Sequence, residues 1–260
     1  MKTFNKSTVA LAGSATIAVA MFLAAPARVL AGTDILHFTV IKAMTDNGVE
    51  TNADGAVVAS QKEQGKANNQ KLSIAVKGLS ANTPYELFAT IDNDTNVTDI
   101  TPFMTDANGE AILEYSSLGK GHGGGKKSDP LPTSLNPVSL IREVDIVNSN
   151  AQAVLTADLS MPDKLQYLIK RDLRSGDIKA SLKIEANSDQ TKFRLLSTGL
   201  TPDTDYLLAF NGEVMQTNTS SSKGKLNIDT LTETPPAILD VRSVELWDIS
   251  SNVVLQAELP

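Results

Sequence analysis

The stretch Gly119 to Ser128 (GKGHGGGKKS) combines glycine with lysine, the residue types that hold phosphate in nucleotide-binding loops. The pattern G-x-x-x-x-G-K-[ST] is not met, because Lys126 is followed by Lys127, and no helix is signalled after it. We therefore interpret the stretch as an exposed flexible loop. The alternative is a local basic patch that binds an anionic polymer or a neighbouring subunit. Four residues would form this patch: Lys120, His122, Lys126 and Lys127.

A second candidate for chemistry is the run Asp92-Asn-Asp94-Thr-Asn96, which imitates the opening of a calcium-binding loop. Its sixth position is Val97 where an EF-hand needs glycine, and its twelfth is Phe103 where an EF-hand needs glutamate. A turn rich in Asp and Asn explains the run. A looser calcium site, with ligands Asp92, Asp94 and Asn96, is the alternative.

The sequence gives little support for any other metal site, for a bound cofactor or for catalysis. The chain has no cysteine, and each of its two histidines, His37 and His122, lacks a second histidine nearby. There is no G-x-S-x-G motif for a hydrolase serine. The thirty acidic residues could supply a glycosidase pair, but aromatic residues for stacking sugars make up only 5% of the chain. We expect no cofactor and no enzymatic activity, with a hydrolase as the least favoured alternative.

The first 31 residues have the pattern of a secretory signal peptide. Lys2 and Lys6 precede an uncharged apolar run over 8–25, and small residues allow cleavage after Ala27 or Ala31. A retained membrane anchor is the alternative reading of the same run. No later segment is long enough to cross a membrane. The whole chain has a net charge of −7, and the leader holds three basic residues and no acid, so the mature chain would be at −10. Such a charge argues against nucleic-acid binding.

The pattern of the remaining sequence indicates an internal duplication of one unit. Residues 78–85 (GLSANTPY) return as 199–206 (GLTPDTDY), and residues 140–159 match 240–259 without a gap. Asp34-Ile-Leu-His-Phe resembles Asp163-Lys-Leu-Gln-Tyr at an offset of 129. We therefore expect repeats over 34–160 and 163–260, with a boundary near 160–162 and an insertion over 119–133 in the first repeat.

Each repeat has the periodicity of β-strands. Leu72, Ile74 and Val76 alternate with polar or small residues, and turn-forming clusters separate such rows. Helical spacing occurs only over 165–173, where the matching segment of the first repeat favours a strand. His37 alternates out of an apolar row and is expected to face solvent, and Trp247 is read as a packed strand residue. The predicted fold is all-β: two tandem, duplicated, immunoglobulin-like β-sandwich domains after the signal peptide.

The motif Gly-Leu-x-x-x-Thr-x-Tyr, followed by an alternating strand, occurs at 78–85 and at 199–206. It resembles the tyrosine-corner stretch of fibronectin type III and related immunoglobulin-like modules. In such modules the tyrosine hydroxyl bonds nearby backbone and orients the start of a strand. The resemblance implies this structural role for Tyr85 and Tyr206.

A charge pattern also recurs in the two repeats. Arg142 and Asp158, like Arg242 and Glu258, lie on the two arms of predicted hairpins. We expect each arginine to pair with its acid across the hairpin, as a contact that supports the fold.

These observations predict an exported, non-catalytic structural, adhesive or matrix-type protein of a bacterial cell surface or periplasm. Self-association through strand edges is part of this hypothesis, and the expected partners are other copies or other cell-surface components. The alternative is a module that binds a carbohydrate or another small ligand.

Overall fold

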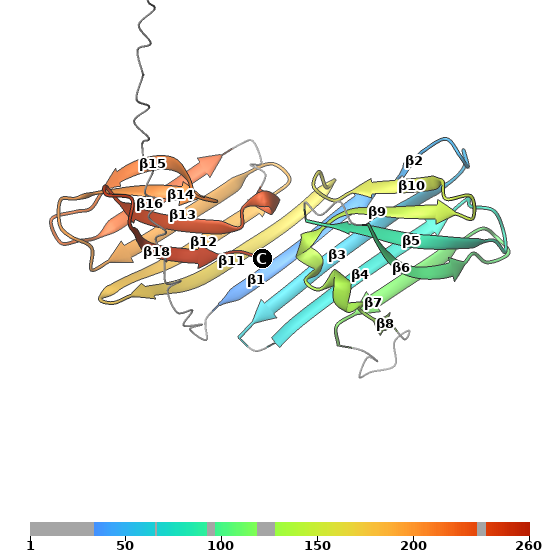
Figure 1. The fold of residues 1–260 in the computed structure, drawn as a ribbon, viewed down its shortest axis with the longest axis horizontal. Coiled ribbons are helices and arrows are strands. Elements are labelled where there is room, and N and C mark those ends of the chain that lie inside the picture. Colours follow the sequence, from blue (N-terminus) through green and yellow to red (C-terminus); the bar gives the residue numbers. More distant parts are fainter. Residues whose placement is uncertain (1–33, 66, 93–96, 119–127, 233–237) are drawn as a thin grey trace, which may run out of the picture.

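The chain folds almost entirely into β-structure, as predicted. The computed structural model describes residues 34–65, 67–92, 97–118, 128–232 and 238–260, which form three sheets (Figure 1). The predicted signal peptide and the Gly/Lys-rich stretch 119–127 lie outside the described residues. Among the described residues, none of the helical segments has the length and apolar character needed to span a bilayer.

The largest sheet has nine strands and extends through both halves of the molecule (Figure 1). In spatial order its strands are β16 (Leu226–Thr232), β13 (Thr191–Thr198), β12 (Ile178–Asn187), β11 (Lys164–Ser175), β1 (Ile35–Ala43), β3 (Asp54–Gln64), β4 (Ala67–Lys77), β7 (Ala111–Ser116) and β8 (Asp129–Pro130). All its neighbours are antiparallel except β7 and β8. The segment 165–173 lies within β11, so the strand reading is confirmed.

Two smaller sheets cover this sheet, one in each half. The first contains β2 (Thr45–Asp46), β10 (Ala153–Asp158), β9 (Ile141–Asn148), β5 (Pro84–Ile91) and β6 (Val97–Met104). The second contains β15 (Glu213–Thr219), β14 (Asp205–Phe210), β17 (Ser243–Asp248) and β18 (Val253–Glu258). Three short 3-10 helices complete the described elements: η1 (Thr133–Leu135), η2 (Val138–Leu140) and η3 (Ile238–Asp240).

The two halves share one strand order. In the large sheet β1-β3-β4-β7 matches β11-β12-β13-β16, and in the small sheets β10-β9-β5-β6 matches β18-β17-β14-β15. This agreement supports the predicted duplication. The additions β8 and η1 begin in the predicted insertion 119–133 and have no counterpart among the described residues of the second half.

The two halves are joined by an antiparallel ladder between β1 and β11, which the sequence did not predict. Phe38 lies directly opposite Tyr167, and these residues correspond in the two repeats. The ladder is therefore centred on a local two-fold axis, as in a symmetric dimer of single sandwiches. The ring centroids of Phe38 and Tyr167 are 6.4 Å apart in an edge-to-face arrangement.

The same symmetry governs the two ends of this ladder. The Asp163 carboxylate accepts a 2.7 Å hydrogen bond from the Ala43 N–H and pairs with Lys42 Nζ at 3.2 Å. The Asp34 carboxylate accepts a 3.4 Å bond from the Asp172 N–H and pairs with a guanidinium nitrogen of Arg171 at 3.3 Å. Each contact in one half therefore has a matching contact in the other.

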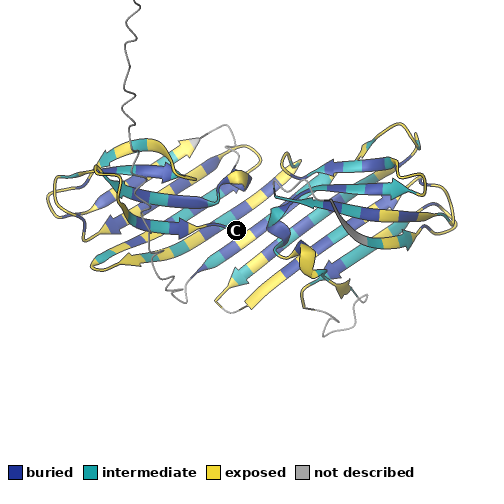
Figure 2. Ribbon diagram, viewed as in Figure 1, coloured by how far each residue is buried: buried dark blue, intermediate teal, exposed yellow. Residues whose placement is uncertain are grey.

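The core lies between the large sheet and the small ones. Side chains alternate between buried and exposed along most strands, as Figure 2 shows by colour. Because directly opposed residues point to the same face of a sheet, the buried Phe38 and Tyr167 place both cores on one face of the large sheet. No described element covers the opposite face, which we call the outer face.

Candidate functional site

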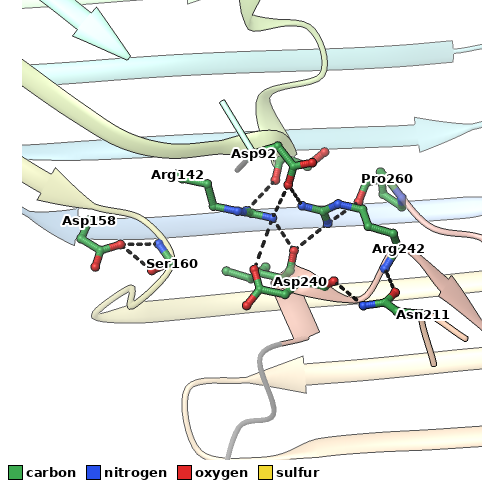
Figure 3. Close-up of polar contacts among 10 residues, drawn as sticks. Asp92, Arg142, Asp158, Ser160, Asn211, Asp240, Arg242 and Pro260 are labelled. Atoms are coloured by element: carbon green, nitrogen blue, oxygen red, sulfur yellow. Dashed lines mark hydrogen bonds and ion pairs between the residues drawn. The ribbon is translucent and has the colours of Figure 1, made fainter. Parts of the chain in front are cut away.

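Four charged residues from the two halves meet near the local two-fold axis (Figure 3). We call this group the arginine cluster; its members are Arg142, Arg242, Asp92 and Asp240. The Arg142 guanidinium donates to the Ser139 carbonyl at 3.3 Å, and the Arg242 guanidinium donates to the Leu239 carbonyl at 2.7 Å. Each arginine therefore binds the carbonyl three residues before it, inside its own half.

The second nitrogen of each guanidinium contacts the other half. Arg142 donates to the Leu239 carbonyl at 2.5 Å, and its Nη2 lies 3.7 Å from carboxylate oxygens of both Asp92 and Asp240. Arg242 donates to the Asp92 carboxylate, and Asp92 directly follows β5 in the first half. These contacts connect the halves at a second place besides the β1–β11 ladder.

Burial and charge in the cluster shift its pKa values. The Arg242 guanidinium holds the pKa of the Asp92 carboxyl below its ordinary value. Burial, and then the nearby Arg242, lower the pKa of Arg142, whose side chain is only 9% exposed. Two cations and two carboxylates balance in charge, so the cluster fits a role in joining the halves.

The predicted pairing of Arg142 with Asp158 is wrong. The Leu159 N–H donates to the Arg142 carbonyl, so Asp158 lies opposite Glu143. Neighbouring residues of a strand point to opposite faces, which sends Arg142 inward and Asp158 outward. Asp158 instead accepts hydrogen bonds from the backbone and hydroxyl of Ser160.

The same correction holds in the second half. Glu258 lies opposite Ser243, and it accepts a hydrogen bond from Gln256 at 2.6 Å. Arg242 points inward to the arginine cluster. The repeat identified the recurring arginines. Their predicted partners were wrong because the pairing of the two hairpin strands is shifted by one residue from the predicted register.

Of the three residues proposed for calcium, only Asp92 belongs to the described structure. Asp92 faces two guanidinium groups, which disfavours a cation at its carboxylate. Asp94 and Asn96 lie outside the described residues, so the looser calcium site stays a prediction. No group of three potential metal ligands occurs among the residues that the structure describes.

The candidate loop residues Lys120, His122, Lys126 and Lys127 also fall outside the described part of the chain. Binding by this loop therefore stays a prediction. His37 is exposed on β1, as expected, and Trp247 lies half-buried on β17. The Trp247 indole N–H donates to Glu245 at 2.7 Å, which gives it a partner inside its own strand.

Both predicted corner tyrosines bond nearby backbone. The Tyr85 hydroxyl accepts a hydrogen bond from the Ser80 N–H at 3.1 Å and donates to Glu50 at 2.6 Å. The Tyr206 hydroxyl accepts from the Thr201 N–H at 3.0 Å. Each tyrosine lies at the start of a strand, β5 or β14, so both have the structural position that the motif suggested.

The outer face of the large sheet carries a concentration of cations that the sequence analysis missed. Lysine and arginine alternate with buried apolar residues along β11, β12 and β13. We call this surface the basic face; its cations are Lys164, Lys170, Arg174, Lys179, Lys183, Lys192 and Arg194. Three acids share it, namely Asp172, Glu185 and Asp229. The basic face is thus net positive on a chain of net charge −7.

Some cations of the basic face stand directly opposite one another. Lys170, Lys183 and Arg194 occupy opposed positions on three neighbouring strands, which are about 4.8 Å apart. Glu185 pairs with Lys183 at 2.8 Å, and Asp229 pairs with Arg194 at 2.5 Å. Within the described structure, Lys170 has no ion pair. Like charges in direct opposition destabilise a sheet, so this row favours an external anion.

The side of the molecule covered by the small sheets has the opposite charge. Arg142 is the only basic residue in the strands of these sheets as the structure describes them, and it is buried. On the outward side of β5, β9 and β10 lies a group of acids that we call the acidic face: Glu86, Glu143, Asp145 and Asp158. Burial, and then the neighbouring Asp145 and Asp158, raise the pKa of Glu143.

Comparison of the sequence with family models and curated proteins gives no relative from which a role could be carried over. No family model matches the chain, and no curated protein sequence matches it.

The Arg242–Asp92 contact predicts a pH effect on stability. We expect Arg242→Met to lose about 2 kcal/mol of unfolding free energy at neutral pH, because charge-assisted hydrogen bonds are removed. The pKa of Asp92 is lower in the folded than in the unfolded protein, so its ion pair with Arg242 stabilises the fold fully at pH values above the unfolded-state pKa. This stabilisation is lost as the pH falls through the folded-state pKa of Asp92. The variant should therefore lose less stability than the wild type between about pH 5 and pH 2.

Urea unfolding across this pH range measures the difference. Lys225→Met removes an exposed cation from a turn of the second half and serves as the matched control. The control is expected to follow the wild-type pH profile. Parallel profiles for wild type and Arg242→Met would contradict the assignment of an acid-sensitive contact to Asp92.

Proposed function

We propose that the chain is an exported, non-catalytic structural protein of matrix or adhesive type, at a bacterial cell surface or in the periplasm. One observation carries this proposal: the β1–β11 ladder makes a single body with a continuous nine-stranded sheet whose outer face is uncovered by described elements. Such a body offers broad faces and strand edges to other molecules. These features suit assembly and adhesion.

The open edge of the large sheet supports self-association in particular. Among the described residues β16 pairs with β13 on one side only, whereas at the far end of the sheet β7 is covered by β8. An uncovered edge strand can pair with the edge of another chain. Leu231 on β16 is 57% exposed and adds apolar surface at this edge.

The alternative of a carbohydrate or small-ligand module gains no comparable support. A shallow hollow on the outer face, lined by Lys183, Glu185, Lys192 and Arg194, holds about 50 Å³. Pockets that enclose a small organic ligand usually measure about 300–1,000 Å³. The hollow is therefore better suited to one charged group of a larger partner.

Leu231→Lys tests pairing through the β16 edge. We expect it to weaken concentration-dependent association about tenfold, because a lysine on an edge strand opposes pairing with a second sheet. Sedimentation velocity over a range of concentrations measures the effect.

Ile112→Lys is the matched control for this substitution. Ile112 is 63% exposed on β7, at the end of the sheet that β8 covers. The control should associate like the wild type. If the wild-type protein is monomeric at every protein and salt concentration, the proposal of self-assembly is wrong. If Leu231→Lys and Ile112→Lys associate equally, self-association does not use the β16 edge.

A further inference from the structure

We propose that copies of the chain stack face to face, with the basic face of one copy on the acidic face of the next. This inference rests on the proposed structural function and names the partner, a second copy, and the surfaces used. It differs from edge pairing because it uses the two broad sides of the molecule. Its basis is the segregation of charge between the two layers.

The segregation is visible in the composition of the strands. Strands of the large sheet contain twelve basic residues: Lys42, Lys62, Lys71, Lys77, Lys164, Lys170, Arg171, Arg174, Lys179, Lys183, Lys192 and Arg194. All of these except Lys42 and Arg171 are on the outward phase of their strands. The same strands contain seven acids, Asp54, Glu63, Glu114, Asp129, Asp172, Glu185 and Asp229, so basic residues predominate. Strands of the small sheets contain these acids among residues with described side chains: Asp46, Glu86, Glu143, Asp145, Asp158, Asp205, Glu213, Glu245, Asp248 and Glu258. The two broad sides of one molecule are therefore complementary in charge, which favours their association.

Within the described structure, most large-sheet cations that have no ion pair lie in the second half, and Lys62 on β3 is the exception in the first half. On the outer face of the first half, Lys71 pairs with Glu114 at 3.2 Å and Lys77 pairs with Asp54 at 3.0 Å. On the basic face, no ion pair joins Lys170, Lys179 or Lys192 to an acid among the described residues. These cations can neutralise a partner without breaking an existing contact.

The acidic face presents the matching arrangement. Glu143 and Asp158 are directly opposed on β9 and β10, and Asp145 is the next outward residue on β9. Burial, and then the neighbouring carboxylates of Asp145 and Asp158, raise the pKa of Glu143, in line with the opposed positions of Glu143 and Asp158. Each face therefore holds like charges in opposition, and contact between the faces would relieve the repulsion on both.

The positions of the two faces determine the form of the assembly. The basic face lies on the outer side of the second half, and the acidic face lies on the opposite side of the first half. A contact between two different surfaces leaves one of each unused, so it does not close into a symmetric dimer. The stack is staggered by half a molecule and can continue through further copies.

An anionic polymer also complements the basic face, but it leaves the acidic face unexplained. A second copy accounts for both faces with one contact. Stacking on a second copy requires the acids on the small-sheet side of the molecule. Binding of an anionic polymer does not require them. Variants of the two faces separate them.

The test uses two variants of the full chain in which charges are removed but shape is kept. The basic-face variant carries Lys170→Gln, Lys183→Gln and Lys192→Gln, and the acidic-face variant carries Glu86→Gln, Glu143→Gln and Asp158→Asn. The amide introduced by Asp158→Asn keeps an oxygen that can accept the hydrogen bonds from Ser160. Circular dichroism and urea unfolding confirm that both variants are folded before association is measured.

At about 0.01 M salt, where charges act over about 30 Å, wild-type protein should form larger species as its concentration rises, and about 1 M salt should disperse them. Each variant alone should associate at least about tenfold more weakly. Mixed together they should form a one-to-one pair that does not grow, because only one intact face of each kind remains. This result is specific to stacking of unlike faces.

Other results overturn the proposal. If both variants associate as strongly as the wild type, the basic and acidic faces do not mediate self-association. If Leu231→Lys weakens association in the same experiment, edge pairing through β16 is supported, and the proposed function is retained. Two variants that stay monomeric when mixed also reject stacking. If wild-type protein binds polygalacturonate through Lys170, Lys183 and Lys192 but shows no salt-dependent self-association, the basic face belongs to an anionic polysaccharide.

Discussion

Replacing Gly224 with alanine is expected to destabilise the protein by about 4 kcal/mol or more, at the upper end of single substitutions. Gly224 has a φ of +64°, and a Cβ there would lie 2.1 Å from the Leu200 carbonyl oxygen. The obstacle is backbone, which cannot turn aside as a flexible side chain can. The Leu200 N–H donates to the Gly224 carbonyl at 3.1 Å, so moving the two segments apart also breaks a hydrogen bond.

Gly212→Ala separates the two causes of this effect. Gly212 has a φ of +78° in the same half, and a Cβ there meets nothing within 4 Å. It should therefore show only the cost of the left-handed conformation, about 1–2 kcal/mol. Urea unfolding of both variants measures the difference. Equal losses would mean that the close approach of Gly224 to Leu200 relaxes without cost.

Gly109 occupies the position in the first half that matches Gly224. A Cβ on Gly109 would lie 1.9 Å from the Leu79 carbonyl oxygen. In each half the glycine lies against backbone of the corner motif itself, at Leu79 or Leu200. The close backbone contact that both glycines make is seen only in the structure.

Strand patterns were readable, because they depend on local alternation. The segment 165–173 fitted helical spacing by itself, but its match with 36–40 favoured a strand, and both segments pair with each other in the structure. Alternation along the chain therefore located most strands. It could not assign partners, since pairing is decided by residues far apart in sequence.

The junction and the arginine cluster were missed for that reason. The alternating pattern of β1 and β11 does not show whether each strand lies at the edge or at the centre of a sheet, because both positions give the same alternation. Arg142 shares the phase of the buried Val144 and Ile146, which shows in hindsight that it points inward. Its partners Asp92 and Asp240 come from segments about 50 and 100 residues away, which no local pattern connects.

The segregation of charge was hidden for a related reason. The chain has 23 basic and 30 acidic residues distributed along its length, and the total says nothing about their faces. Only when β11, β12 and β13 are aligned do Lys170, Lys183 and Arg194 fall into one row. The Gly/Lys-rich stretch attracted attention because its cations are adjacent in sequence.

A second large effect is expected at the centre of the junction, where Phe38→Ala should cost about 3–5 kcal/mol. Phe38 is 2% exposed, and its ring contacts Tyr167 of the other half edge-to-face. The cavity left by the ring would lie on the local two-fold axis, where neither half can close it alone. The loss should therefore weaken the β1–β11 ladder and not one sandwich in particular.

Hydrogen exchange distinguishes this outcome from ordinary loss of core packing. In Phe38→Ala we expect faster exchange of the amides that join β1 to β11, in both halves. Phe193→Ala is the matched control, because Phe193 is 4% exposed and packs on Phe210 at 5.2 Å within the second half. Its effect should be confined to β12, β13 and β14. If Phe38→Ala left the β1–β11 amides as protected as in the control, the two sandwiches would be held together mainly by the arginine cluster.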